Sequence, residues 1–136
     1  MSNEAHHHHD GRRVEDARLI TGAGRYAADW NEPGQLYGCF VRSDRPHAEI
    51  VSVDTREAVS FPGVKAVFTG EDAVRAGYVK APHTMGFVGK NGMKARSPER
   101  PVLAHKRVRF VGEAVALVVA DSAGAAEDAA ELVEVE

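Results

Sequence analysis

The sequence predicts one α+β domain, in which strands and short helices follow one another without the strict alternation of a doubly wound sheet. Residues 114–120 are the most apolar run of the chain and are rich in β-branched side chains, as expected of a fully buried strand. A second apolar run at residues 35–42 predicts another strand. Residues 123–132 are rich in alanine and glutamate and follow the N-capping pair Asp121-Ser122, which predicts a helix.

The N-terminal part of the chain is expected to contribute little regular structure. Residues 1–12 are polar and contain the run His6–His9, so they predict a disordered, histidine-rich tail before a domain that covers residues 13–136. The histidine run can bind nickel or zinc as any flexible histidine tract can, but a flexible tail is the simpler interpretation. Glycines and prolines between residues 22 and 34 predict an irregular segment.

The remaining predicted elements are short and have turn residues at their ends. In chain order they are a strand at residues 49–54, a helix at 56–60, a strand at 64–69, a helix at 71–76 closed by Gly77, and strands at 101–104, 108–111 and 133–136. In the first of these strands, alternation places Ile50 outside and Val51 and Val53 on the other face, unless the strand is bulged. Asp54 or Thr55 is placed to cap the helix that follows.

Two segments have no complete interpretation from the sequence. Residues 78–99 show no sustained period and contain several glycines and prolines, so they predict a long loop, with a short strand near residues 85–88. A loop of this length in a compact domain is usually functional, contact-making or mobile. Residues 132–136 alternate as in a strand that is cut off before any turn, so we expect either a fragment or a strand whose partner is completed elsewhere.

The composition gives no reason to expect a nucleic acid or a membrane as partner. The formal net charge is −3, and basic residues are interleaved with acidic ones, so no long block of one sign is present. No stretch reaches the roughly 18 apolar residues that span a bilayer. The polar N-terminus also lacks the apolar region of a signal peptide, so a cytoplasmic protein is expected.

The cysteine and histidine residues predict no metal site. The single cysteine, Cys39, excludes an intramolecular disulfide and cysteine-ligated zinc or iron–sulfur sites within this chain. It lies in an apolar run, which favours a small buried hydrophobic residue over a reactive thiol. His47, His83 and His105 lie far apart in predicted loops, without the spacing of metal ligands.

No catalytic or cofactor-binding residue is predicted from spacing either. Glu113 is the one carboxylate within an apolar stretch, and either burial raises its pKa or its carboxylate lies in water at a strand edge, which is the favoured interpretation. Gly22-Ala23-Gly24 predicts a turn and not a phosphate-binding loop, because no buried strand precedes it and the third glycine is missing. Five serines also lack the GxSxG context of a hydrolase nucleophile: Ser43, Ser52, Ser60, Ser97 and Ser122.

A series of local patterns nevertheless follows in order over nearly the whole chain after residue 13. They are VEDARLITGAGRYAAD at residues 14–29, LYGCFVRS at 36–43, PHAEI at 46–50, DTREA at 54–58, PGVKAVFTG at 62–70, RPVLA at 100–104, VRFVGEAVA at 108–116 and AEDAAELVEVE at 126–136. In this order and at these separations they resemble the N-terminal segment of the molybdenum-binding large subunit in the xanthine dehydrogenase, aldehyde oxidase and aerobic carbon monoxide dehydrogenase family. The resemblance is closer to the bacterial three-subunit enzymes than to the single-chain eukaryotic ones.

The resemblance implies a fold called the α/β hammerhead, in which mixed twisted strands pack with two or three short helices. For the full assembly it implies oxidative hydroxylation of aldehydes, heterocycles or carbon monoxide, with oxygen from water. The family's cofactors are molybdenum–molybdopterin, expected as the cytosine dinucleotide form in the full subunit, with iron–sulfur clusters and FAD on companion subunits.

The resemblance also limits the prediction for this chain. The family's glutamate base, cofactor-binding motifs and substrate pocket lie in later domains, so no catalytic, cofactor-binding or metal residue is carried over, and Glu113 is not that base. We therefore expect a structural and docking domain whose partners are the remaining molybdenum-binding domains and the iron–sulfur and FAD subunits. The alternative is a stand-alone, non-catalytic protein-binding module that reuses the fold, with residues 78–99 as its contact loop.

Overall fold

The computed structural model describes residue 13 and residues 15–78, 88–94 and 100–136. The predicted tail at residues 1–12 and the predicted strand near residues 85–88, apart from its last residue, lie outside the described residues. The chain divides into two compact units, Met1–Pro33 and Gly34–Glu136, which are described separately.

The described part of the first unit contains two short helical elements that the sequence did not predict. Helix α1 covers Asp16–Ile20, and a 3₁₀ turn, η1, covers Ala27–Asp29 within the segment expected to be irregular. The predicted turn at Gly22 is confirmed: its φ is 73° and its backbone amide donates to the carbonyl oxygen of Leu19 at 3.2 Å. A positive φ favours glycine because a side chain there is strained.

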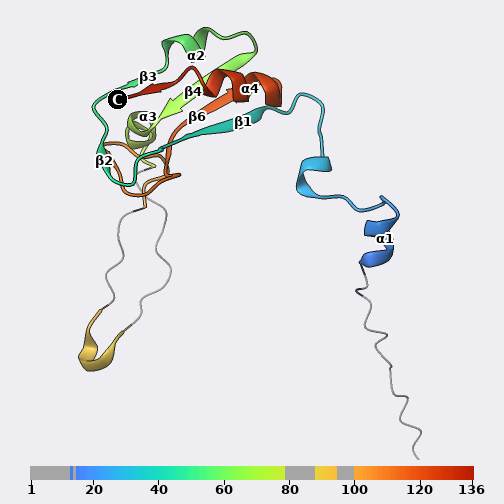
Figure 1. The fold of residues 1–136 in the computed structure, drawn as a ribbon, viewed down its shortest axis with the longest axis horizontal. Coiled ribbons are helices and arrows are strands. Elements are labelled where there is room, and N and C mark those ends of the chain that lie inside the picture. The colour runs from blue at the N-terminus through green and yellow to red at the C-terminus, as the bar shows by residue number, and fades with distance from the viewer. Residues whose placement is uncertain (1–12, 14, 79–87, 95–99) are drawn as a thin grey trace, which may run out of the picture. The chain divides into compact units, whose positions relative to one another are not determined.

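The centre of the second unit is a three-stranded antiparallel sheet (Figure 1). Strand β6 (Ala114–Ala120) lies between β1 (Tyr37–Arg42) and β4 (Val64–Thr69). The apolar run that predicted a buried strand therefore forms the middle of the sheet, where both of its edges are hydrogen-bonded.

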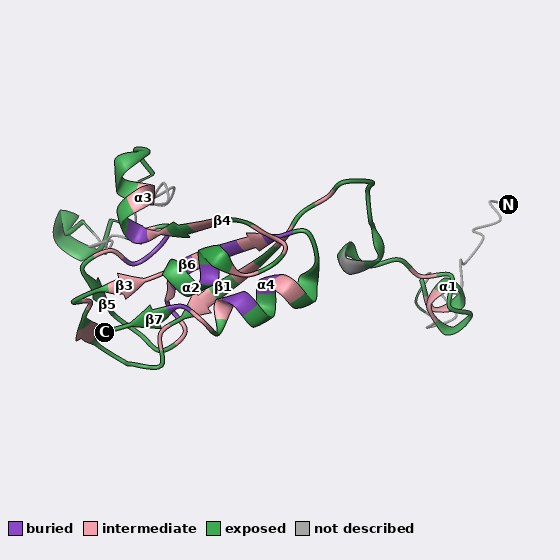
Figure 2. Ribbon diagram, turned by 90° about the horizontal axis from the view of Figure 1, so that it is seen from above, coloured by how far each residue is buried: buried purple, intermediate pink, exposed green. Residues whose placement is uncertain are grey.

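Two helices cover one face of this sheet (Figure 1). Helix α4 (Ala123–Ala130) packs on β1 and β6, and α2 (Arg56–Ser60) packs on β4. The predicted N-cap of α4 is confirmed, because the Ser122 hydroxyl accepts a hydrogen bond from the Ala125 amide at 3.2 Å. The main hydrophobic cluster fills the space between the layers, and Figure 2 shows buried stretches on α2, α4 and β6. The buried members of the cluster are Ala58, Ala116, Val118, Ala129 and Val133.

A second hydrophobic cluster lies at one end of the sheet and shows that the predicted placement of Ile50 needs correction. It consists of Ala104, Val108 and Val115, against which Ile50 packs, whereas Val51 is 72% exposed. The prediction that placed Ile50 outside is therefore wrong. Strand alternation does not apply across residues 50–52, because the chain there does not continue as one strand.

The short strands around this cluster pair in two further antiparallel ladders. Strand β2 (Ala48–Glu49) pairs with β5 (Arg107–Val108), and β3 (Val53–Asp54) pairs with β7 (Glu134–Val135). The strand predicted at 49–54 is thus two strands, the one predicted at 108–111 ends at residue 108, and residues 101–104 form none. The burial of residues in these short ladders depends on contacts between segments far apart in sequence, which local alternation does not predict.

Helix α3 (Gly70–Arg75) starts one residue earlier than predicted, and a capping box caps its N-terminus. The Thr69 hydroxyl accepts from the Asp72 amide, and the Asp72 carboxylate accepts from the Thr69 amide at 2.8 Å. Gly70 is buried against the loop before β5: a Cβ atom there would lie 2.1 Å from the carbonyl oxygen of Ala104. The close approach of two backbones therefore requires glycine at this position.

Candidate docking surface

Strand β6 has apolar residues at every position and therefore on both of its faces. On the face toward the helices, Ala116, Val118 and Ala120 are fully buried. On the opposite face, Leu117 and Val119 are only half-buried. Antiparallel sheets with one face in water normally alternate apolar and polar residues, so the composition of β6 is that of a strand covered on both faces.

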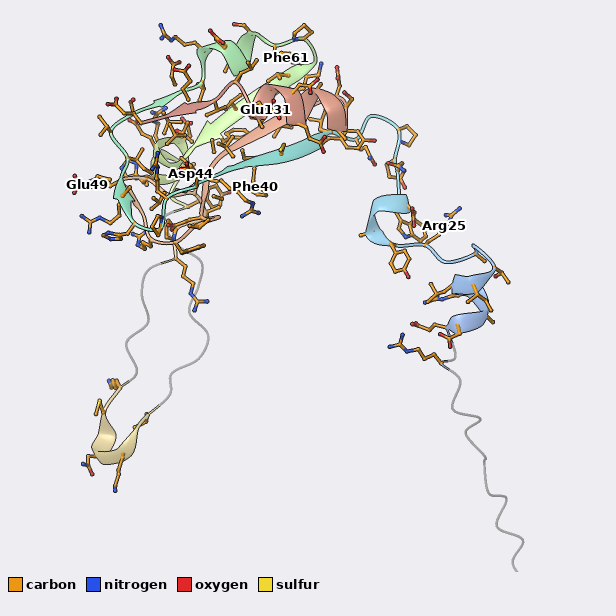
Figure 3. All side chains as sticks on the ribbon, in the orientation of Figure 1. Arg25, Phe40, Asp44, Glu49, Phe61 and Glu131 are labelled. Atoms are coloured by element: carbon orange, nitrogen blue, oxygen red, sulfur yellow. The ribbon has the colours of Figure 1, made fainter. Side chains whose placement is uncertain are left out.

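The neighbouring strands place aromatic side chains beside Leu117. In the sheet register, Phe40 of β1 and Phe68 of β4 lie opposite Leu117 from either side, and each aromatic residue is 46% exposed. Figure 3 shows Phe40 on the side of β1 away from the helices. Apolar cross-strand neighbours of this kind stabilise a sheet, but they also leave a continuous apolar row facing outward.

We call this uncovered face of the sheet the open sheet face. Its members are apolar side chains that point away from α2 and α4: Leu36, Phe40, Phe68, Leu117 and Val119. Gly38 lies among them on β1, where a Cβ atom would approach Leu117 Cδ1 to 3.2 Å. A side chain at residue 38 would crowd Leu117, so glycine leaves space for the Leu117 side chain on this face.

One end of the open sheet face carries a positive charge. Arg42 follows Phe40 by two residues on β1, and its guanidinium carbon lies 5.5 Å from the centroid of the Phe40 ring. The Arg42 side chain also donates a hydrogen bond to the carbonyl oxygen of Gly112 at 2.8 Å. Among the described residues, no carboxylate lies within ion-pair distance of Arg42.

A hollow of about 540 Å³ lies beside Arg42. Its size is within the usual range of small-molecule pockets, but much of its lining is apolar or already paired. The lining residues are Arg42, Arg100, Pro101, Arg109, Phe110, Gly112, Glu113 and Ala114. Phe110, which lines the hollow, and its neighbour Val111 are 57% and 62% exposed.

Glu113 is buried, which corrects the prediction that its carboxylate lies in water. The residue is 7% exposed and is the one charged residue that is buried in the described part of the chain. Its carboxylate accepts hydrogen bonds from the backbone amide of Arg109 at 2.5 Å and from the Arg109 guanidinium at 3.1 Å. Both oxygens are thus held by one residue across a turn, so the hydrogen bonds stabilise the loop.

Two carboxyl groups with lowered pKa values make local hydrogen bonds at the starts of α2 and α3. The side-chain hydrogen bond from Arg56, followed by its backbone amide bond, lowers the pKa of Asp54 from 3.8 to about 2. Hydrogen bonds from the Thr69 amide and hydroxyl lower the pKa of Asp72. Asp54, and not Thr55, supplies the hydrogen bond to the first turn of α2.

The other candidate residues are dispersed over the fold. Cys39 is half-buried on the helix side of β1, His47 is exposed, and His105 is half-buried, while His83 lies outside the described residues. Within the described ranges, no three His, Cys, Asp or Glu side chains are grouped closely enough to hold a metal ion. In the same part of the chain, no helix is long and apolar enough to cross a membrane.

Comparison with known proteins identifies the fold. A family model for the aldehyde oxidase and xanthine dehydrogenase a/b hammerhead domain matches residues 21–136. The chain belongs to this family. The expected α+β hammerhead is therefore confirmed, with its antiparallel sheets and few short helices.

Relatives of this hammerhead domain are much longer proteins. The chain is 48% identical over 126 residues to the nicotine 6-hydroxylase large subunit of Paenarthrobacter nicotinovorans, covering 91% of this chain and 14% of that protein. It is 42% identical over 125 residues to the carbon monoxide dehydrogenase large chain of Afipia carboxidovorans, covering 92% and 14%. The crystal structure of quinoline 2-oxidoreductase from Pseudomonas putida 86 superposes with a TM-score of 0.77 at 43% identity, over 91% of this chain and 15% of that chain. The hammerhead domain thus spans about one seventh of the length of these relatives.

The open sheet face was not among the sites predicted from the sequence. A signal was present, because Gly38, Phe40 and Arg42 alternate along β1 and Leu36, just before the strand, continues the same alternation. The uniformly apolar sequence of β6 predicts a fully buried strand, whereas Leu117 and Val119 are only half-buried. That difference marks the face.

Proposed function

We propose that this hammerhead domain is a structural and docking part of the large subunit of a molybdenum hydroxylase, and that it is not catalytic alone. The observation that carries the proposal is the alignment of nearly the whole chain with about one seventh of several large subunits. The domain has a core of its own but leaves an apolar sheet face uncovered, as a domain does that packs against further polypeptide.

The reaction proposed for the assembled enzyme is oxidative hydroxylation of an aldehyde, a heterocycle or carbon monoxide. Support comes from the names of the relatives, which include a nicotine 6-hydroxylase, a carbon monoxide dehydrogenase and an aldehyde oxidoreductase from Desulfovibrio gigas. Water would supply the oxygen atom, and the electrons would leave through cofactors of the assembly.

The described residues do not fit the molybdenum–molybdopterin cofactor, for which the cytosine dinucleotide form is proposed. They contain no grouped metal-ligating side chains, and every buried side-chain nitrogen or oxygen among them has a hydrogen-bond partner. Among the described residues, no buried polar side chain is thus left unpaired to receive a ligand. We place the cofactor in other domains of the subunit and assign no step of its chemistry to these residues.

The proposed partners are the remaining molybdenum-binding domains of the large subunit, together with iron–sulfur and FAD subunits. One relative is the gamma subunit of a 6-hydroxypseudooxynicotine dehydrogenase complex, 42% identical over 91% of this chain, which supports an assembly of several subunits. A cytoplasmic location and the absence of nucleic acid and membrane partners complete the proposal.

A chimaera tests this function directly. The matched segment of the nicotine 6-hydroxylase large subunit is replaced by this chain, and the product is coexpressed with that enzyme's companion subunits. We expect a molybdenum-loaded complex that hydroxylates nicotine, whereas a large subunit lacking the segment should not assemble. A chimaera that is soluble but takes up no molybdenum would contradict the proposal, as would turnover of an aldehyde or purine by the separate 136-residue chain.

A further inference from the structure

We propose that the open sheet face docks onto an apolar surface in the rest of the large-subunit polypeptide, and that this surface carries a carboxylate opposite Arg42. The inference rests on the proposed function and adds to it which face of the hammerhead domain is covered, and by what chemistry. The helix-covered face and the small ladders β2–β5 and β3–β7 are not required for the contact.

The first argument is the composition of the sheet on its uncovered side. A half-exposed Leu117 lies between two phenylalanines, each 46% exposed, in one row across all three strands. Aromatic residues are enriched in the buried centre of interfaces. Covering a continuous apolar row removes its surface from water, which is favourable in free energy. The row is therefore built to be covered by a further layer.

The second argument is the charge at the end of the row. Arg42 has a hydrogen bond to Gly112 and contacts the Phe40 ring, but no carboxylate partner among the described residues. A layer packed on Phe40 would also cover this guanidinium and remove water from it. A buried guanidinium requires a counter-charge, so the covering surface should supply a carboxylate.

The occupant is the remaining large-subunit polypeptide and not a second copy of this chain. The relatives contain about six times as much further sequence as the matched segment, which provides the covering layer within one chain. A second copy would offer only the apolar residues of its own open sheet face, so that Arg42 would be buried without a carboxylate.

Thiol accessibility tests the inference in the chain and in the nicotine 6-hydroxylase chimaera described above. Phe68→Cys reports on the open sheet face, and Phe40→Cys is a second reporter in case the first variant does not fold. The matched control is Val59→Cys on α2, since Val59 is 55% exposed and lies on the helix that covers the other face. Alkylation rates are measured by peptide mass spectrometry with iodoacetamide as the probe.

We expect the thiol of the Phe68→Cys variant to react readily in the separate chain and at least tenfold more slowly in the assembled chimaera, while the control changes less than threefold. An assembled, nicotine-hydroxylating chimaera in which that thiol reacts as fast as in the separate chain would overturn the inference but leave the proposed function intact. Protection that is already present in the separate chain and increases with its concentration would assign the face to a second copy and would also overturn it. Failure of the unmodified chimaera to assemble is instead the result that contradicts the proposed function.

Discussion

Arg109 holds both carboxylate oxygens of Glu113, with its backbone amide 2.5 Å from one oxygen and its guanidinium 3.1 Å from the other. Glu113 is buried, whereas the Arg109 side chain is 38% exposed. The pair thus joins the two ends of the turn between β5 and β6. Gly112 permits that turn by adopting a φ of 88°. This arrangement makes the one buried charge of the described residues a part of the fold.

Replacing Glu113 with alanine should destabilise the domain. The backbone amide of Arg109 would lose its acceptor in a part-buried position, which costs about 1 kcal/mol or more. Urea unfolding of the Glu113→Ala variant should show that loss, and Glu113→Gln should lose less because it keeps one acceptor oxygen. An unchanged free energy of unfolding for the alanine variant would contradict the structural role.

Gly70→Ala should destabilise the domain by at least about 2 kcal/mol, because the new methyl group would overlap the Ala104 carbonyl of a second backbone segment. Gly124→Ala is the matched control: it lies in α4 with open space around its Cβ position. Alanine there should stabilise the helix by roughly 0.5–1 kcal/mol. Thermal unfolding followed by circular dichroism measures both, and equal effects of the two substitutions would show that Gly70 is not closely approached.

Val118→Asp should unfold the domain. Val118 is fully buried and lies in the main hydrophobic cluster, so the new carboxylate would be buried without a partner. Such a charge costs on the order of 5 kcal/mol, comparable with the whole stability of a small domain. Val59→Asp, on an exposed part of α2, should leave the melting temperature nearly unchanged. If the Val118 variant melts like the parent, the assignment of β6 to the core is wrong.

The Asp54–Arg56 contact predicts a pH dependence between about pH 2 and pH 4. The pKa of Asp54 is lowered from 3.8 to about 2, so the stabilisation is present above pH 3.8 and is lost as the pH falls toward 2. A ¹³C NMR titration of the Asp54 carboxyl should have its midpoint near 2. Arg56→Gln should move the midpoint back toward 3.8, and an unshifted midpoint in that variant would refute the assigned cause.

The sequence was sufficient for elements whose own residues determine them. The apolar run Ala114–Ala120, the Ser122 cap and the Ala-rich helix after it all occur where expected, because burial and capping act locally there. The hammerhead family was also predictable, because the order and spacing of its motifs are features of the sequence itself.

The errors concern residues whose environment is set by contacts between separate segments or by the direction of a turn. Ile50 is half-buried because it packs against the cluster of Ala104 and Val108, more than fifty residues later in the chain, and local alternation does not predict that contact. Glu113 was expected in water because its partner, Arg109, lies beyond a glycine turn whose direction was not predicted. The open sheet face was missed because the strands that align Phe40, Leu117 and Phe68 are far apart in sequence.

The central claim is that this domain supports the chemistry of a molybdenum hydroxylase without taking part in it. The direct measurement is the turnover of nicotine per molybdenum atom in the chimaera that carries Glu113→Gln, compared with the unmodified chimaera. The account predicts equal turnover per molybdenum within about twofold, even if less of the complex assembles. A fall of a hundredfold or more with molybdenum content unchanged would show that Glu113 acts in the reaction, and would contradict the account.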